Sequence, residues 1–217
     1  MIKAIIFDLD GVICSTDHYH YQAWKELADR LKIPFDEKVN NRLRGVSRME
    51  SLEIILEKSR VSYSETEKYA FAEEKNERYK ELLTSMTEAD LSYEVKSTLD
   101  ALRCRKLKLA IGSSSKNAKF ILERLGLRDY FDAISDGTNI SHSKPDPEVF
   151  LKAAQMLGER PEDCMVVEDA FAGIVAARVG GFVPVGIGEA AQYVKYCQPI
   201  LNFSDLLLVS LATKDRT

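Results

Sequence analysis

The chain has 217 residues, of which 45% are hydrophobic and 29% are charged, and its 30 basic and 34 acidic residues give a net charge of −4. These proportions are typical of a globular protein of one or two domains, and they argue against nucleic acid or a membrane as a partner. No apolar stretch approaches a membrane span, and acidic residues follow the first apolar run too soon for a signal peptide. The four scattered cysteines have no CxxC spacing, so we expect reduced thiols in a cytoplasmic protein.

The first predicted element is a buried strand at residues 3–7, an isoleucine-rich run closed by Gly11. Charged, helical patterns then replace strand patterns. Residues 19–31 form an amphipathic helix, and Ser47 and Ser64 each begin a Ser-x-x-Glu capping box ahead of a further helix. We therefore predict a helical cap domain at residues 16–87, inserted into a catalytic core domain made of residues 1–15 and 88–217.

Strands and helices alternate after the insertion. Ser115 and Asp146 are the expected caps of two helices, and Gly158 is an expected stop. The alternation predicts an α/β fold, with a Rossmann-like, mainly parallel sheet flanked by helices and an inserted all-helical cap. The residues after 188 should supply the last strand and the terminal helix. The other predicted strands are 107–114, 133–136, 164–169 and 182–188, and the predicted helices are 94–104, 116–125, 146–158 and 170–181.

Polar side chains follow several of these strands, and ligands of open α/β sheets bind at the carboxyl ends of the strands. The carboxylates among them would repel one another in a low-dielectric cleft, so a hard divalent cation, Mg²⁺, is expected with them. Hydroxyls and the amides of a following helix suit a phosphoryl group, which a lysine would neutralise further. The residues are Asp8, Asp10, Ser113, Ser114, Ser115, Lys144, Glu168 and Asp169.

Several motifs carry a resemblance to a known family. The segment FDLDGV, a serine at the end of a later strand, a Lys-Pro pair and a late Glu-Asp pair resemble the phosphotransferases of the haloacid dehalogenase superfamily. Within it, residues 1–180 are similar to the β-phosphoglucomutases. The segments that carry this likeness are DLDGVI, YHYQAWKELA, RGVSR, EEKNERY, SSSKNA, SKPDPEVFL and VEDAFAGI.

The resemblance implies roles for residues of the core. Asp8 would be the nucleophile that forms an aspartyl phosphate, and Asp10 the general acid and base. Ser113 and Lys144 would stabilise the transferring phosphoryl group. Mg²⁺ would be held by Asp8, Asp10 (through its backbone carbonyl), Glu168 and Asp169, and substrate would be bound by Ser114, Ser115, Lys116 and Asn117.

It also implies roles in the cap. Arg48 would clamp a phosphate with its forked guanidinium, and His20 and Lys75 would couple cap closure to the position of Asp10. Closure would keep water from the aspartyl phosphate. The residues expected to contact substrate or to serve as a hinge are Thr16, His20, Trp24, Gly45, Val46, Arg48 and Lys75.

The activity that follows is the exchange of phosphate between C1 and C6 of β-glucose phosphate through β-D-glucose 1,6-bisphosphate, with a small sugar phosphate as partner and a monomer as the expected state. Two alternatives stay open. A sugar-phosphate phosphatase would share Asp8, Asp10, Lys144 and Asp169. A phospho-receiver module would also pair an aspartate with acidic metal ligands, but a switch has no need of a cap.

Overall fold

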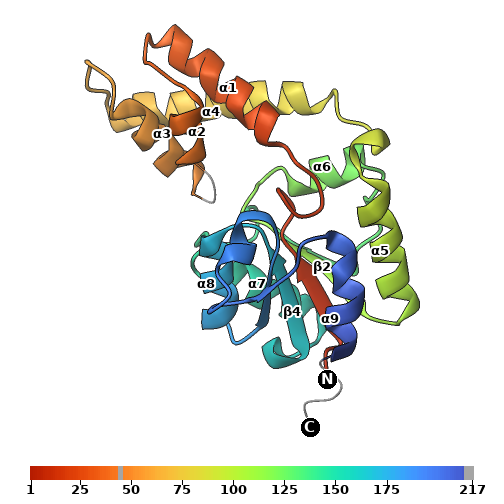
Figure 1. The fold of residues 1–217 in the computed structure, drawn as a ribbon. Coiled ribbons are helices and arrows are strands. Elements are labelled where there is room, and N and C mark those ends of the chain that lie inside the picture. Colours follow the sequence, from red (N-terminus) through yellow and green to blue (C-terminus); the bar gives the residue numbers. More distant parts are fainter. Residues whose placement is uncertain (44–45, 213–217) are drawn as a thin grey trace. The chain divides into compact units, whose positions relative to one another are not determined.

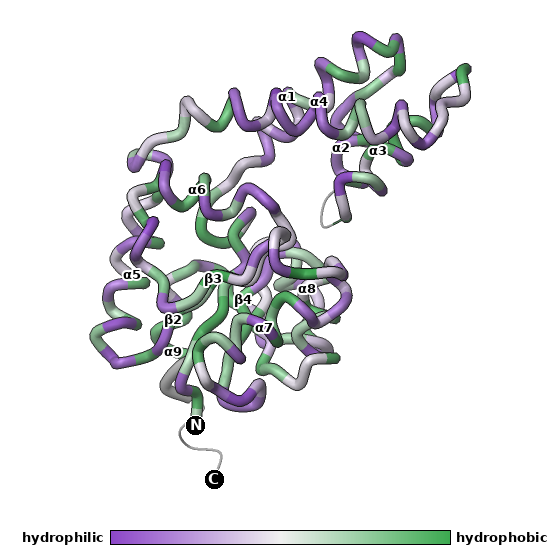
Figure 2. The backbone as a smooth tube through the Cα atoms, turned by 180° about the vertical axis from the view of Figure 1, so that it is seen from behind, coloured by the Kyte–Doolittle hydropathy of each residue, from purple (hydrophilic) through white to green (hydrophobic). Residues whose placement is uncertain are grey.

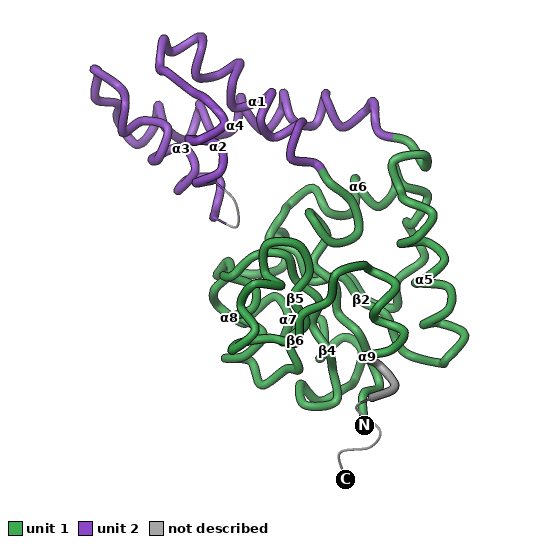
Figure 3. Tube along the Cα trace, viewed as in Figure 1, with its two compact units in different colours: residues 1–15, 87–217 green, residues 16–86 purple. Residues whose placement is uncertain are grey.

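The computed structural model describes residues 1–43 and 46–212. The chain divides into two compact units (Figure 3), of which the first, the core unit, comprises Met1–Ser15 and Thr87–Thr217. The second, the helical unit, comprises Thr16–Met86. Each unit has its own buried apolar cluster.

A parallel sheet forms the centre of the core unit (Figure 1). Within the described residues it has six strands in the order β3-β2-β1-β4-β5-β6, and every neighbouring pair is parallel. The predicted Rossmann-like fold is therefore confirmed. The strands are β1 (Ala4–Phe7), β2 (Lys108–Gly112), β3 (Ala133–Ser135), β4 (Cys164–Glu168), β5 (Val183–Gly186) and β6 (Gln198–Pro199).

The strand β1 lies in the middle of this sheet, where the order of strands reverses. Phe7, its last residue, pairs in register with Ile111 of β2 and Val167 of β4. The residues that follow these three strands therefore emerge at one edge of the sheet. That edge, at a topological switch point, is where open α/β sheets bind ligands.

Helices cover both faces of the sheet, with α7 and α8 on one side and α5 and α9 on the other (Figure 1). Successive side chains of β1 point to opposite faces of the sheet. Ile6 packs in the apolar cluster with residues of α7 and α8, while Phe7 stacks on Phe203 with ring centroids 5.7 Å apart. Burial on both faces explains the continuous apolar runs of the strands. The helices of this unit are α5 (Tyr93–Cys104), α6 (Ala118–Arg124), α7 (Glu148–Leu157), α8 (Phe171–Val179) and α9 (Leu206–Ala212), with short 3₁₀ turns η1 (Glu88–Asp90), η2 (Pro161–Asp163), η3 (Gly188–Gln192) and η4 (Phe203–Asp205).

Two predicted helix starts are wrong. α6 begins at Ala118, after Asn117, and Ser115 does not cap it. The Ser115 hydroxyl instead accepts a hydrogen bond from the Asn117 amide (3.2 Å), which closes a turn ahead of the helix. The predicted cap at Asp146 is wrong in the same way, because α7 begins at Glu148, after Pro147, and the Asp146 carboxylate accepts from the Glu148 amide (2.9 Å) without capping the helix. The predicted stop is confirmed, since Gly158 ends that helix with a φ of 68°.

The helical unit consists of α1 (Asp17–Arg30), α2 (Glu37–Asn41), α3 (Arg48–Leu56) and α4 (Glu65–Leu83). Both predicted capping boxes are present, at Ser47 and Ser64. The apolar faces of the helices meet in a cluster that includes Trp24, Leu52 and Ile55. Figure 2 shows that the residues along α1 and α4 are largely hydrophilic, while those of the strands in the core unit are mostly hydrophobic. None of the helices in the described part of the chain is long and apolar enough to cross a membrane.

Candidate active site

A buried ion-pair cluster lies at the carboxyl edge of the sheet. Asp8 follows β1, Glu168 ends β4, and the ammonium group of Lys144, from the loop before α7, contacts both carboxylates. The three side chains are 11%, 1% and 7% exposed, respectively. The Lys144 ammonium also lies 4.7 Å from the centre of the Phe150 ring. The structure therefore brings the predicted nucleophile together with the predicted phosphoryl-binding lysine.

The charges of this cluster perturb one another strongly. Burial lowers the pKa of Lys144, but the negative charges of Asp8 and Glu168 outweigh that effect and hold its pKa above the ordinary value. Burial raises the pKa of Glu168 to about 7, although Lys144 opposes the rise. Burial, followed by the charges of Asp8 and Glu168, raises the pKa of Asp169 to about 8. Burial and the neighbouring carboxylates thus both disfavour a negative charge on Asp169.

Gly11 brings the turn after Asp10 against Asp169. Its φ is +82°, and a side chain at this position would overlap the Asp169 carboxylate. The Gly11 amide donates to the Cys14 carbonyl (2.7 Å), which keeps the turn tight. The charge of Asp10 contributes to the raised pKa of Asp169. Asp8, Asp10 and Asp169 consequently share one small region.

These carboxylates fit a hard cation by their chemistry, because Mg²⁺ prefers oxygen ligands. The Glu168 carboxylate, however, is engaged at both oxygens, one with Lys144 and the other with the Ala170 amide (3.1 Å). In residues 1–43 and 46–212, no group of three or more His, Cys, Asp or Glu side chains is arranged to hold a metal ion. The donors are therefore present at this edge without forming a ready ligand cage.

The serine segment after β2 is folded by its own hydroxyls. Ser113 is 2% exposed, and its hydroxyl accepts from the Ser115 amide (3.1 Å). Asn117 is buried, and Lys116 is exposed. The hydroxyls of Ser113 and Ser115 therefore shape the turn as well as lying near the sheet edge.

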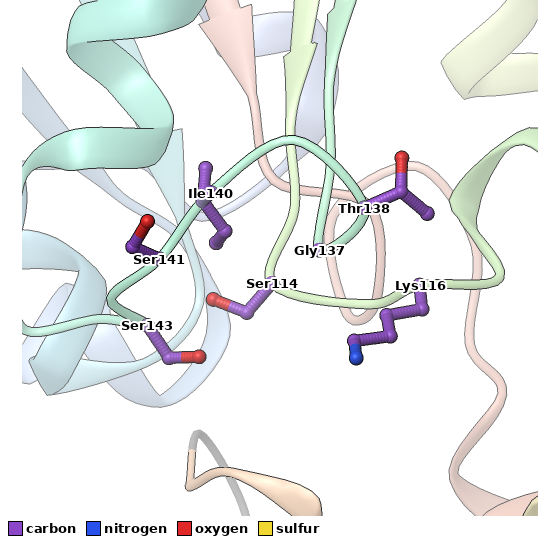
Figure 4. Close-up of a pocket in the computed structure, with 7 residues that line it drawn as sticks. All are labelled: Ser114, Lys116, Gly137, Thr138, Ile140, Ser141 and Ser143. Carbon is purple, nitrogen blue, oxygen red and sulfur yellow. The ribbon is translucent and has the colours of Figure 1, made fainter.

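A cavity of about 490 Å³ opens beside this segment (Figure 4). Figure 4 shows Ser114 between Lys116 on one side and the Ser141–Ser143 stretch on the other. The Ser114 hydroxyl oxygen is buried and has no hydrogen-bond partner within the described chain. Its hydrogen-bonding capacity is therefore unused within the described chain. The residues that line the cavity are Ser114, Lys116, Gly137, Thr138, Ile140, Ser141 and Ser143.

Sequence reasoning missed the wall formed by residues 137–143. The signal was available, because the hydroxyl-rich stretch follows β3 and so belongs to the same sheet edge. Gly137 lets this loop approach closely, since a side chain there would overlap the Ser114 carbonyl. Glu148 of α7 holds the loop by accepting from the amides of Ser141 (2.9 Å) and His142 (2.7 Å).

In the helical unit, two of the predicted residues, the half-buried His20 and the buried Lys75, form a polar contact. The Lys75 ammonium donates to Nδ1 of His20 (2.7 Å) and lies 4.8 Å from the Trp24 ring centre and 4.5 Å from that of Tyr79. Since an ammonium only donates, Nδ1 of His20 carries no proton. Burial, together with the charges of Lys75 and Arg48, holds the pKa of His20 well below its ordinary value.

Arg48 begins α3 and reaches α4, where it donates to Asn76 (2.8 Å) and to Glu73 (3.3 Å). Thr16 is fully buried and accepts from the Tyr79 hydroxyl (3.0 Å), and Val46 is exposed. Gly45 lies outside the described residues. The predicted substrate-binding roles of these residues remain predictions. The contacts of Glu73 and Asn76 with Arg48 were not predicted, because they depend on how two helices pack.

Comparison with known proteins identifies relatives over nearly the whole chain. The chain is 43% identical to a β-phosphoglucomutase of Bacillus subtilis over 209 residues, covering 95% of this chain and 92% of that protein. It is 33% identical to the fructose-1-phosphate phosphatase YqaB of Escherichia coli, covering 84% of this chain and 95% of that protein. The crystal structure of a β-phosphoglucomutase from Clostridium difficile matches with a TM-score of 0.89 and 40% identity, covering 99% of this chain and 97% of that one.

The predicted resemblance is thereby confirmed, and a family model agrees with it. That model, described as haloacid dehalogenase-like hydrolase, matches residues 2–181, which include all the predicted site residues of the core unit. The chain belongs to the haloacid dehalogenase-like hydrolase family.

Proposed function

We propose that the protein is a magnesium-dependent β-phosphoglucomutase. It interconverts β-D-glucose 1-phosphate and glucose 6-phosphate through an aspartyl phosphate on Asp8 and through β-D-glucose 1,6-bisphosphate. The observation that carries this proposal is the 43% identity, over 95% of the chain, to the Bacillus subtilis β-phosphoglucomutase. The buried cluster of Asp8, Lys144 and Glu168 supplies the chemistry that phosphoryl transfer needs.

In the first half-reaction, a carboxylate oxygen of Asp8 attacks the phosphorus of the bisphosphate. The bond from phosphorus to the sugar oxygen breaks, and Asp10 gives that oxygen a proton. In the second, the C6 hydroxyl of a β-glucose 1-phosphate loses its proton to Asp10 and attacks the phosphorus of the aspartyl phosphate. The bond from that phosphorus to the Asp8 oxygen breaks, and the bisphosphate so formed is released and rebinds in the opposite orientation. Lys144 and Ser113 stabilise the charge on the phosphoryl oxygens in both steps.

Asp8, Asp169 and the backbone carbonyl of Asp10 are the groups that would hold Mg²⁺, and the ion would supply positive charge to the phosphoryl oxygens. Glu168 would not bind the ion directly, because both oxygens of its carboxylate are already engaged, one by Lys144 and the other by the Ala170 amide. It fixes the position of the lysine that meets the phosphoryl group.

The rest of the substrate is a sugar carrying a second phosphate. Ser114, Ser115, Lys116 and Asn117 bind it in the core unit, where the 490 Å³ cavity offers hydroxyls and an ammonium group. Phosphates suit such donors because they carry about −1.5 to −2 charge. We further propose a cytoplasmic monomer. The residues of the helical unit proposed to act on substrate are Thr16, His20, Trp24, Gly45, Val46, Arg48 and Lys75.

A sugar-phosphate phosphatase is the second candidate, and the 33% identity to the Escherichia coli fructose-1-phosphate phosphatase favours it. Hydrolysis would use the same Asp8, Asp10, Lys144 and Asp169, with water replacing the sugar hydroxyl. The two activities differ in their products, which are a sugar phosphate for the mutase and free phosphate for the phosphatase.

Replacing Asp8 tests the covalent mechanism. Asp8→Asn should lower glucose 6-phosphate formation by at least about 10⁴-fold, because the amide is a poor nucleophile. Asp129→Asn is the matched control, since Asp129 is exposed and the charge change is the same. Circular dichroism and thermal unfolding should show both variants folded. An Asp8→Asn variant that retains turnover would exclude the aspartyl phosphate.

A further inference from the structure

The Arg48 guanidinium is held within the helical unit by two residues of α4. Its Nη1 donates to Glu73 Oε2 (3.3 Å) and its Nη2 to Asn76 Oδ1 (2.8 Å). The amide of Asn76 donates in turn to the other oxygen of Glu73 (3.3 Å). The three side chains therefore form a closed triangle, defined here as the Arg48 triangle.

The two partners of Arg48 differ in how firmly they are fixed. Asn76 is 5% exposed and lies next to the buried Lys75. The Glu73 side chain is 62% exposed, whereas that of Arg48 is 28% exposed. Asn76 can therefore keep the plane of the guanidinium in place, while Glu73 can swing into water at small cost.

The charge around Arg48 favours the binding of a further anion. Arg48 and Lys75 are close enough that both disfavour a charge on His20. Burial lowers the pKa of Arg48, and the charges of Glu73 and then Glu77 oppose that fall. Glu77 has a partner of its own in Lys80 (2.7 Å), so Glu73 is the carboxylate that directly occupies the guanidinium. The half-buried Arg48 and the buried Lys75 thus lie near one exposed carboxylate, that of Glu73.

We propose that Glu73 is an internal counter-ion of Arg48 that the phosphate of the sugar substrate displaces, and that Asn76 is the positioning residue that holds Arg48 for this exchange. The proposal rests on the proposed function, in which Arg48 acts on substrate, and it takes the group that Arg48 binds to be the phosphate that is not being transferred. A phosphate carries more charge than a carboxylate and accepts two parallel hydrogen bonds from a guanidinium. Phosphate therefore displaces Glu73, and only the fraction of molecules with a released Arg48 binds substrate at full affinity.

The consequence is that Glu73 weakens substrate binding. A partly exposed ion pair of this kind changes an equilibrium by about 1.4- to 5-fold. Glu73→Gln should therefore lower the KM for β-glucose 1-phosphate, at saturating bisphosphate, by about 1.4- to 5-fold, without raising kcat. The hydrolysis of a small aryl phosphate, which brings no second phosphate, should not change.

Glu74→Gln is the matched control. Glu74 is the next residue of α4 and forms a forked ion pair with Arg30 (2.8 and 2.6 Å), so the variant has the same charge change without touching the Arg48 triangle. Its KM should equal that of the wild type. A Glu73→Gln variant with no lower KM than Glu74→Gln overturns the role of Glu73, whereas a wild-type protein that makes no glucose 6-phosphate overturns the proposed function and this inference with it.

A second variant tests the displacement from the opposite direction. Asn76→Asp places a fixed carboxylate against Arg48, where the wild type has an uncharged acceptor. It should raise the KM for β-glucose 1-phosphate, while hydrolysis of the aryl phosphate shows that the core unit remains active. A KM that is unchanged in the folded Asn76→Asp variant would mean that a carboxylate held against Arg48 does not compete with phosphate, and it would overturn the displacement.

Discussion

The proposed role of Arg48 can be tested by comparing two reactions, one that needs a second phosphate on the substrate and one that does not. Because it would contact the phosphate that is not transferred, Arg48→Ala should lower kcat/KM for mutase turnover by about 10- to 100-fold, the value of a charged hydrogen bond. Hydrolysis of a small aryl phosphate should change by less than about threefold. Equal losses in the two assays would show that Arg48 is not a phosphate clamp.

His20 makes the stability of the protein sensitive to acid. Burial and the charges of Lys75 and Arg48 keep it neutral in the folded state, with a lowered pKa. The unfolded chain takes up a proton at His20 below about pH 6.5, where the folded chain does not, so the free energy of unfolding falls as the pH drops. The slope from this residue is at most about 1.4 kcal/mol per pH unit.

The measurement compares wild type with His20→Gln, whose amide can still accept from Lys75 but cannot titrate. Denaturant unfolding at pH 7 and pH 5.5 should show a loss in the wild type that exceeds the loss in the variant by about 1 kcal/mol. Identical pH dependence in the two proteins would mean that His20 is not held neutral in the folded state.

Individual site residues could be predicted when they follow a strand and not when they depend on packing between helices. Asp8, Lys144 and Glu168 were predicted from the ends of their elements, and they do meet in the folded chain. Glu73 is one of many glutamates of a charged helix, and nothing in the sequence distinguishes it from Glu74. Only the approach of α3 to α4 shows which of them reaches Arg48.

At the scale of elements, contact with the site determines which residue can stand in the first turn of α8. Gly173 lies in the helix, where alanine is ordinarily favoured by about 1 kcal/mol. A side chain at this position, however, would overlap the Glu168 carboxylate. The helix therefore carries a glycine where the carboxylate that holds Lys144 packs against it.

Gly173→Ala should consequently destabilise the protein by about 1–3 kcal/mol, the usual cost of overpacking, in spite of its better helix propensity. Activity should fall as well, because the Glu168–Lys144 contact is disturbed. Thermal unfolding and the mutase assay together check both effects. A variant that is more stable and fully active would show that Glu168 has room to move.

Helix starts were predicted correctly where the residues that cap the helix are close together in the sequence. The capping boxes at Ser47 and Ser64 depend on residues three positions apart, and both form. Ser115 misled the prediction because a serine before a helical pattern can also close a turn with the amide two residues on. α6 therefore begins at Ala118, three residues after the expected cap.

At the scale of the whole molecule, the alternation of strands and helices predicted a parallel sheet with a helical insertion, and the fold class is confirmed. The order of the strands could not be read from the sequence, since it depends on where each crossover returns. The strand β1 carries the nucleophile because it lies between β2 and β4, so that Asp8 is flanked by the ends of both. The likeness to β-phosphoglucomutases extends over both units, so we treat the chain as one catalytic protein.

The central claim is that the phosphoryl group returns to a sugar rather than to water. The direct measurement is ³¹P NMR of the protein with Mg²⁺, β-glucose 1-phosphate and a trace of β-glucose 1,6-bisphosphate. We predict that the glucose 1-phosphate signal is replaced by that of glucose 6-phosphate, with little inorganic phosphate. Accumulation of inorganic phosphate and free glucose in place of glucose 6-phosphate would contradict the claim and assign the protein to the phosphatases.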